Sequence, residues 1–185
     1  MKQCINNASD RELGKYWERQ FCIMAYKYGK CFTPHQWNSV EKSAVCYKAN
    51  KNIYLLPDIT IWTSPGEHHE IKHKNPTKKN SVGLEKYRFD SLMSFKNETK
   101  QKVYYTIHNH DLSGGRDGTE NNIRHWFTSE VGVNIDDKNA FVCDGYSWVN
   151  GQKKDVIMYY WDYGLFCLLK NLWREQGRLF PAHVI

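Results

Sequence analysis

Two carboxylates and a lysine stand at a spacing that suits metal-assisted chemistry. Asp58 follows a proline, Glu70 comes twelve residues later, and Lys72 follows two positions after that. Apolar β-branched residues lie on both sides of a Ser-Pro-Gly break at 64–66, which predicts two strands joined by a tight connection. If these strands pair, Asp58 lies beside Glu70, and the two carboxylates repel each other unless a cation separates them. A divalent metal, which prefers oxygen ligands, would meet that need.

The lysine adds a second chemical role on the same strand. Side chains alternate across a strand, so Glu70 and Lys72 share one face while Ile71 points to the other. From there the ammonium group of Lys72 would position a water molecule or stabilise a developing negative charge. The alternative is a structural or interaction protein in which Asp58, Glu70 and Lys72 form a surface salt-bridge cluster.

Together these residues resemble the signature of the PD-(D/E)xK nuclease superfamily, and the matching positions are Pro57, Asp58, Glu70 and Lys72. That superfamily includes restriction enzymes, Holliday-junction resolvases and viral cap-snatching endonucleases. The resemblance implies that Asp58 and Glu70 hold Mg²⁺ or Mn²⁺, with the Ile71 carbonyl as a third ligand. It also implies endonucleolytic hydrolysis of phosphodiester bonds, in DNA rather than RNA. The alternative is a catalytically inactive nuclease-fold module that binds nucleic acid or protein.

The predicted first helix carries a further carboxylate. A capping box at Ser9 precedes an apolar stripe with helical spacing. Gly14 and Glu18 on this helix match a Gly-x-x-x-Glu pattern of the superfamily, whose glutamate faces the metal. The resemblance therefore implies a catalytic and metal-site role for Glu18, beside the ligands or at a second ion. The alternative is a solvated carboxylate paired with Lys15 or Arg11.

Basic residues follow directly on the motif. Next to a metal site, Lys74, Lys78 and Lys79 are expected to contact the phosphates of a nucleic acid; otherwise they belong to a solvated loop. Lys86 and Arg88 lie on the next predicted helix, and they either touch nucleic acid or are ordinary surface charges. The net charge of +6 agrees with a polyanionic partner.

The order of the predicted elements would position these residues. A helix from Ser9, strands up to and through the motif, a helix over Ser81–Phe95 and a strand over Val103–Ile107 follow one another. This is the helix, three strands, helix, strand core order of the superfamily. The predicted fold class is α/β, with a mixed central β-sheet flanked by helices. We expect one domain over residues 1–185, with its core at about 9–110.

Residues 111–185 are predicted to extend this core. Their patterns favour a short helix over Thr119–Ser129, a hairpin of Phe141–Trp148 with Val156–Trp161, and a closing helix over Tyr163–Gln176. The extension is expected to widen the sheet and bury its flank, or to form a homodimer face.

Composition bears on the compartment and on competing chemistry. No apolar run approaches the length of a membrane span, and the first residues lack the apolar core of a signal peptide. The six cysteines show no CxxC spacing, which favours reduced thiols over a disulfide framework or a zinc knuckle. We therefore expect an intracellular protein, cytoplasmic or associated with a nucleoid or nucleus. The histidines within His108–Asp111 lie too close together for a His-Asn-His nuclease hairpin.

Overall fold

The computed structural model describes residues 10–35, 46–49, 52–62, 66–114, 121–149 and 152–179. Its helices are α1 (Asp10–Lys27), α2 (Lys86–Thr99) and α3 (Leu169–Leu179). Its strands are β1 (Phe32–Pro34), β2 (Cys46–Ala49), β3 (Asn52–Leu55), β4 (Ile59–Ile61), β5 (Glu67–His73), β6 (Ser81–Glu85), β7 (Lys102–His108), β8 (Trp126–Glu130), β9 (Phe141–Val149), β10 (Gln152–Asp162) and β11 (Cys167–Leu168). The predicted capping residue Ser9 and the predicted turn residues 64–65 lie outside the described residues.

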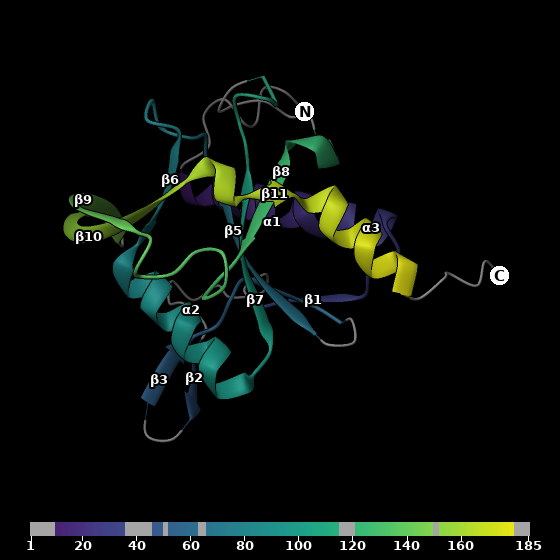
Figure 1. The fold of residues 1–185 in the computed structure, drawn as a ribbon, viewed down its shortest axis with the longest axis horizontal. Helices are drawn as coiled ribbons and strands as arrows, with labels where there is room; N and C mark the ends of the chain where they lie inside the picture. Colours follow the sequence, from purple (N-terminus) through teal and green to yellow (C-terminus); the bar gives the residue numbers. More distant parts are fainter. Residues whose placement is uncertain are drawn as a thin grey trace.

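Six strands form the central sheet in the order β1-β4-β5-β7-β8-β11 (Figure 1). Strand β4 is antiparallel to β5, β5 is parallel to β7, and β7 is antiparallel to β8, so the sheet is mixed. A parallel pair needs a crossover connection, and helix α2 lies in the connection from β5 to β7. The elements α1, β1, β4, β5, α2 and β7 follow the expected core order. The predicted α/β class with a mixed, helix-flanked sheet is confirmed.

The helices pack on both faces of this sheet. Helices α1 and α3 share one apolar cluster with the sheet, and Trp17, Ile71 and Trp173 belong to it. Helix α2 packs into a second cluster, which contains Phe89 and Tyr105. Because side chains alternate along each strand, β5 and β7 contribute residues to both layers. This alternation leaves the face of β5 that carries Glu70 on the side of α2.

The predicted helix over Ser81–Phe95 is wrong in its first five residues. Ser81–Glu85 forms strand β6, and helix α2 begins only at Lys86. Within β6, Val82 and Leu84 are fully buried and pair with β10. Their alternation fits a strand, but the strand forms because its partner β10 is present, and that partner lies far later in the chain.

The predicted helix over Thr119–Ser129 is also wrong. A single 3-10 turn covers Ile123–His125, and β8 then joins the central sheet between β7 and β11. The closing helix begins later than predicted, because a 3-10 turn and β11 precede α3 at Leu169. In both segments, pairing with a distant strand outweighs the helical spacing of the apolar residues.

The predicted hairpin is present as β9 and β10, which pair along nine residue positions. It pairs with β6 rather than with the central sheet, so β6-β10-β9 form a second sheet. Tyr159 and Trp161 of β10 pack against Phe89 of α2. The segment after β7 therefore both widens the central sheet, through β8 and β11, and adds a second sheet over α2. No helix in the described part of the chain is long and apolar enough to span a membrane.

Candidate active site

The antiparallel pairing of β4 with β5 brings the two motif carboxylates together. Ile59 lies opposite His69 in the register, so Asp58, which directly precedes β4, comes beside Glu70. The backbone N–H of Ile71 donates a hydrogen bond of 2.7 Å to Asp58 Oδ2. Both carboxylates are buried, with exposures of 5% for Asp58 and 1% for Glu70. Two neighbouring carboxylates out of contact with water require compensating positive charge.

Two cations supply that charge to Glu70. Lys72 Nζ donates to Glu70 Oε1 at 2.6 Å, as its place on the same face of β5 predicts. Arg88 Nη2, from helix α2, donates to Glu70 Oε2 and also to the carbonyl of Leu56 at 2.7 Å. Burial alone would raise the pKa of Glu70, but Arg88 and Lys72 outweigh it and lower that pKa to about 2. The carboxylates in turn raise the pKa of Lys72 despite its burial, so the ammonium group stays charged.

Among the residues that the structure describes, no lysine or arginine pairs directly with Asp58 or Glu18. Burial, together with the charge of Glu70, raises the pKa of Asp58 to about 6. Burial, together with the charge of Asp58, raises the pKa of Glu18 to about 8. Lys15 lowers the pKa of Glu18, but its effect is smaller than those of Asp58, Lys72 and Glu70. Glu18 of α1 is half-buried and is affected more by the charges of Asp58, Lys72 and Glu70 than by Lys15, so a purely solvated pair with Lys15 does not describe it.

The donor set of this cluster suits a hard divalent cation, because its carboxylates supply oxygen ligands and a cation would relieve the burial and repulsion that raise the pKa values of Asp58 and Glu18. The side chains are not arranged as a finished cage: among the described residues, no three His, Cys, Asp or Glu groups converge at ligand distance. Both oxygens of Glu70 are engaged by Lys72 and Arg88. A cation entering beside Asp58 would therefore compete with Lys72 for Glu70 Oε1. The role of the Ile71 carbonyl stays a prediction.

The predicted nucleic-acid contacts lie in different environments. Lys78 and Lys79 are exposed in the turn before β6. Lys74 points inward, where its Nζ donates to the Gly83 carbonyl at 2.5 Å, and burial lowers its pKa to about 8. For Lys74 to contact a phosphate, it would have to leave that carbonyl.

The two charges on α2 also differ from each other. Lys86 is half-exposed and pairs with Asp90 at 2.5 Å, as expected for an ordinary i, i+4 surface pair. Arg88 is buried at 7% exposure, so the alternative that it is an ordinary surface charge is wrong, while its contact with nucleic acid stays a prediction. Its bond to Glu70 makes it part of the carboxylate cluster.

Sequence reasoning did not single out Glu85, at the end of β6. Burial would raise its pKa, but Lys72, its own backbone amide, Lys74 and Ser147 together lower it. Ser147 of β9 donates a hydrogen bond of 3.0 Å to Glu85 Oε1. The predicted helix over Ser81–Phe95 includes Glu85, so the neighbouring residues in the sequence did not indicate that Glu85 lies near Lys72. The only available sign was the alternation of apolar and polar residues in 81–85.

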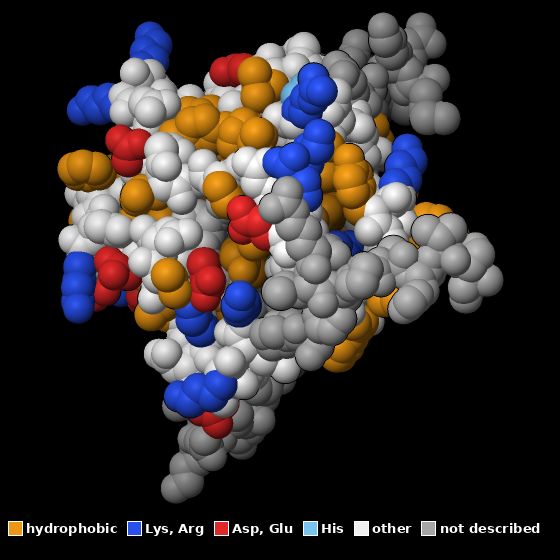
Figure 2. All heavy atoms as spheres, turned by 45° about the vertical axis from the view of Figure 1, so that its right-hand side comes forward, with side chains coloured by type: hydrophobic (Ala, Val, Ile, Leu, Met, Phe, Trp, Pro, Cys, Tyr) orange, Lys and Arg blue, Asp and Glu red, His pale blue; other side chains and the backbone are white. Residues whose placement is uncertain are grey.

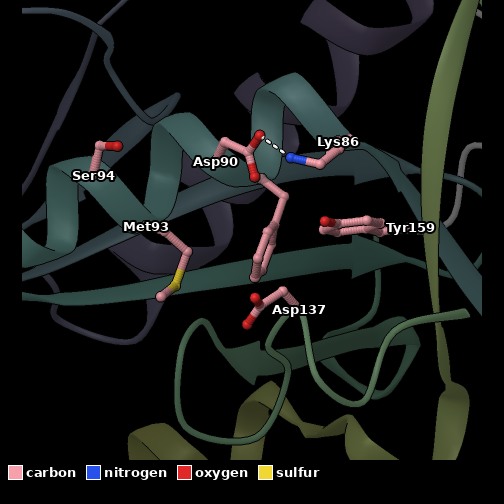
Figure 3. Close-up of a pocket in the computed structure, with 7 residues that line it drawn as sticks. Lys86, Asp90, Met93, Ser94, Asp137 and Tyr159 are labelled. Carbon is pink, nitrogen blue, oxygen red and sulfur yellow. Dashed lines mark hydrogen bonds and ion pairs between the residues drawn. The ribbon is translucent and has the colours of Figure 1, made fainter. Parts of the chain in front are cut away.

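A shallow cavity of about 300 Å³ lies elsewhere, between α2 and β10 (Figure 3). Lys86 and Asp90 form their ion pair at its rim, and Met93, Asp137 and Tyr159 line it. None of the predicted catalytic residues reaches this cavity. The carboxylate cluster is therefore the candidate site on chemical grounds.

Comparisons with known proteins agree with this arrangement at the level of the fold. The sequence matches no protein-family model and no curated protein. Its structure is similar to that of Hjc, a Holliday junction resolvase from the archaeal hyperthermophile Archaeoglobus fulgidus, with a TM-score of 0.52 and 12% sequence identity. The similarity covers 87% of this chain and 95% of the resolvase chain. The chain therefore has a mixed α/β fold that resembles the restriction-endonuclease-like fold of Hjc.

Proposed function

We propose that this chain is a divalent-metal-dependent endonuclease that hydrolyses phosphodiester bonds in nucleic acid, with DNA as the expected substrate. The observation that carries the proposal is the buried pair of Asp58 and Glu70 with Lys72 on the same face of β5, in a nuclease fold. A buried cluster of this kind costs folding free energy, which argues against a purely structural salt bridge. The nuclease fold makes a nucleic-acid partner plausible.

Asp58 and Glu70 would hold Mg²⁺ or Mn²⁺, and Glu18 would add a third carboxylate from α1. The ion, when bound, would stabilise charge on the phosphate and acidify a water molecule. Lys72 remains charged beside Glu70, so it is suited to orient the attacking water or to stabilise the negative charge that develops. Arg88 neutralises the second oxygen of Glu70 and holds this carboxylate in place.

The second candidate is an inactive nuclease-fold module that binds nucleic acid or protein. It is favoured by one observation: Lys72 and Arg88 together engage both oxygens of Glu70, so the cluster is charge-compensated without a metal. Calorimetric titration with Mn²⁺ separates the two candidates, because an active site should bind the ion and a self-compensated cluster should not.

The test of the activity is a cleavage panel with supercoiled plasmid, single-stranded DNA, branched DNA and RNA, each with Mn²⁺ and with excess EDTA. We expect cleavage that requires Mn²⁺ or Mg²⁺ and is abolished in EDTA. Ca²⁺ should bind without supporting turnover, because the larger ion accepts looser geometry. Undiminished cleavage in EDTA would contradict the proposal.

A further inference from the structure

The hairpin of β9 and β10 extends beyond the strand that anchors it. Strand β6 pairs only with Met158–Asp162 of β10, whereas β9 pairs with Gln152–Tyr160. The distal residues 144–149 and 152–157 therefore form a two-stranded segment, which we call the arm. In Figure 1 the hairpin lies beside β6, on the side of the molecule opposite α3. Most of its described side chains are exposed, and none of them belongs to either apolar cluster, so the arm can contact a partner.

The two faces of the arm differ in charge. Directly paired residues in an antiparallel ladder share a face, so Lys154 lies on the same face as Ser147. The opposite face carries Lys153, and its Nζ lies 4.2 Å from the ring centroid of Tyr146. Asp144 and Asp155 of the arm belong to that opposite face as well, by the same register. Within the arm, the face of Lys154 holds a cation and no carboxylate, while the face of Lys153 is acidic.

The face of Lys154 is also the one that adjoins the candidate active site. Ser147 donates its hydrogen bond to Glu85 Oε1 at 3.0 Å. Lys72 of β5 and Lys74, just after this strand, both help to lower the pKa of Glu85. The side chain of Lys154 is exposed, and it forms no ion pair within 4.0 Å with any residue that the structure describes. An exposed ammonium group without an ion pair among the described residues suits contact with an extended polyanion.

We propose that the Lys154 face of the arm binds the phosphodiester backbone of a nucleic acid whose reacting phosphate lies at Lys72. This inference rests on the proposed function, because it takes nucleic acid as the substrate of that site. Lys154 contacts a backbone phosphate and no base, so it contributes binding affinity without sequence preference. Lys153 is held over Tyr146 on the acidic face and makes no such contact.

The experiment compares two neighbouring substitutions, Lys154→Ala and Lys153→Ala. Each removes one positive charge from an exposed position of the same strand, and the two positions lie on opposite faces of the arm. Binding to fluorescent single-stranded DNA, duplex DNA and RNA is measured by anisotropy in Ca²⁺ and in EDTA, over a range of salt concentrations. Thermal unfolding of both variants is expected to match the parent, because neither side chain is buried.

Lys154→Ala should weaken binding by about two- to fivefold, as expected when one exposed charge no longer reaches a phosphate. Its log–log salt slope should fall by about 0.9 on duplex DNA, or about 0.7 on a single strand. Lys153→Ala should leave both quantities at the parent values. Equal effects of the two substitutions, or none from Lys154→Ala, would overturn the proposal.

Failure of the proposed function has a different signature. If the parent protein binds nucleic acid, and this binding depends on Lys154, but the protein never cleaves it, the proposed nuclease function is wrong and the proposed arm interface is supported. If the parent cleaves nucleic acid and Lys154→Ala leaves its binding affinity unchanged, the proposed arm interface is wrong and the proposed nuclease function is supported. If the arm instead joins two copies of the chain, the two variants bind nucleic acid with equal affinity and the parent protein sediments as a dimer. This outcome also overturns the proposal.

Discussion

At the scale of residues, the buried side chain of Arg88 connects three parts of the candidate site. Its guanidinium contacts Glu70 on β5 and the Leu56 carbonyl, two residues before Asp58, while its backbone belongs to α2. The planar guanidinium can serve two acceptors at once, which an ammonium group does less well. Arg88 therefore sets the distance between the Pro57–Asp58 segment and Glu70.

Arg88→Met tests this role through stability. Removing one partner from a buried ion pair leaves the other charge uncompensated, and Glu70 then retains only Lys72. We expect a decrease on the order of 3 kcal/mol in the free energy of unfolding. The matched control is Lys86→Met on the same helix, which breaks a surface pair and should cost less than about 1 kcal/mol. Urea denaturation of both variants measures these decreases in the free energy of unfolding. Similar values for the two variants would show that the Arg88 pair stabilises the protein no more than a surface ion pair does.

The carboxylates predict a pH dependence of stability in metal-free protein. The pKa of Glu18 is raised to about 8 and that of Asp58 to about 6. A carboxyl group with a raised folded-state pKa contributes stability that is fully present below its unfolded pKa, and this stability is lost as pH rises through the folded value. Between about pH 5 and about pH 8.5 in EDTA, the parent should therefore lose stability relative to Glu18→Gln, which has no carboxyl group to titrate.

Thermal unfolding of the two proteins across this range provides the measurement. Comparing them cancels the contributions of titrating groups that both proteins share, such as Lys74, whose pKa is lowered to about 8. Mn²⁺ should restore the stability of the parent, more strongly at high pH, because the ion neutralises the ionised cluster. A difference between parent and Glu18→Gln that does not change with pH would place Glu18 outside the cluster.

Glu70 and Lys72 should separate metal binding from chemistry. Glu70→Gln removes a ligand charge, so metal affinity and cleavage should disappear together. Lys72→Ala removes a cation that holds Glu70 Oε1, so Mn²⁺ affinity should stay the same or rise. Its single-turnover cleavage rate should still fall about a hundredfold or more, as when one preorganised electrostatic group is removed. Calorimetry and cleavage on the same preparations test this, and parental cleavage by Lys72→Ala would exclude it as the catalytic lysine.

At the scale of elements, strand β6 links the two sheets to the site. It packs Val82 and Leu84 into the core beneath α2, and its Gly83 carbonyl accepts hydrogen bonds from Lys74 and Tyr105. The ring of Tyr160, on the paired position of β10, lies directly over Gly83. A glycine here allows the ring and the strand to approach closely.

Gly83→Ala should therefore destabilise the protein. An added Cβ would lie 2.5 Å from a ring carbon of Tyr160, so the ring or the strand must move. We expect a decrease of about 1–3 kcal/mol in the free energy of unfolding, the usual cost of overpacking. Gly14→Ala on α1 is the matched control, because no heavy atom lies within 4 Å of its added Cβ and alanine favours a helix. Chemical denaturation should show opposite signs for the two; a neutral Gly83→Ala would mean that Tyr160 simply turns away.

At the scale of the whole molecule, the chain has a net charge of +6, and on the face seen in Figure 2 the basic side chains are not gathered in one patch. Figure 2 shows Lys and Arg side chains in separate groups over one face, with acidic and hydrophobic side chains between them. Several cations are also engaged internally, as Lys72, Lys74 and Arg88 show. A nucleic acid would therefore follow particular exposed lysines rather than a uniform basic surface.

Lys78 and Lys79 are the exposed members of the predicted basic loop. Replacing both by alanine should weaken binding to every nucleic acid alike, and should lower the duplex salt slope by roughly 0.9 for each phosphate that the loop no longer neutralises. Lys74→Ala should instead cost stability, because it leaves the Gly83 carbonyl without this donor. Anisotropy against salt concentration and urea denaturation provide the two readouts. An unchanged slope would assign Lys78 and Lys79 to solvent.

The sequence by itself was enough to predict the fold class and the proximity of Asp58, Glu70 and Lys72. Only a few residues separate β4 from β5, and the two-residue period of a strand puts Glu70 and Lys72 on one face. These relations are local, so they can be deduced before any tertiary contact is known. The core order from α1 to β7 followed from apolar spacing for the same reason.

Only the tertiary structure decided the positions of Arg88, Glu85 and the arm. Arg88 reaches Glu70 because α2 crosses over the sheet, and nothing near Arg88 in the sequence records that crossing. Ser81–Glu85 is a strand because β10 pairs with it, and β8 is a strand because β7 and β11 enclose it. Strand formation depends on partners that lie far away in the chain, whereas helical spacing can be seen within one segment. The pairing of β6 with β10, which contradicts the predicted helix over Ser81–Glu85, is also the one that brings Ser147 of β9 to Glu85.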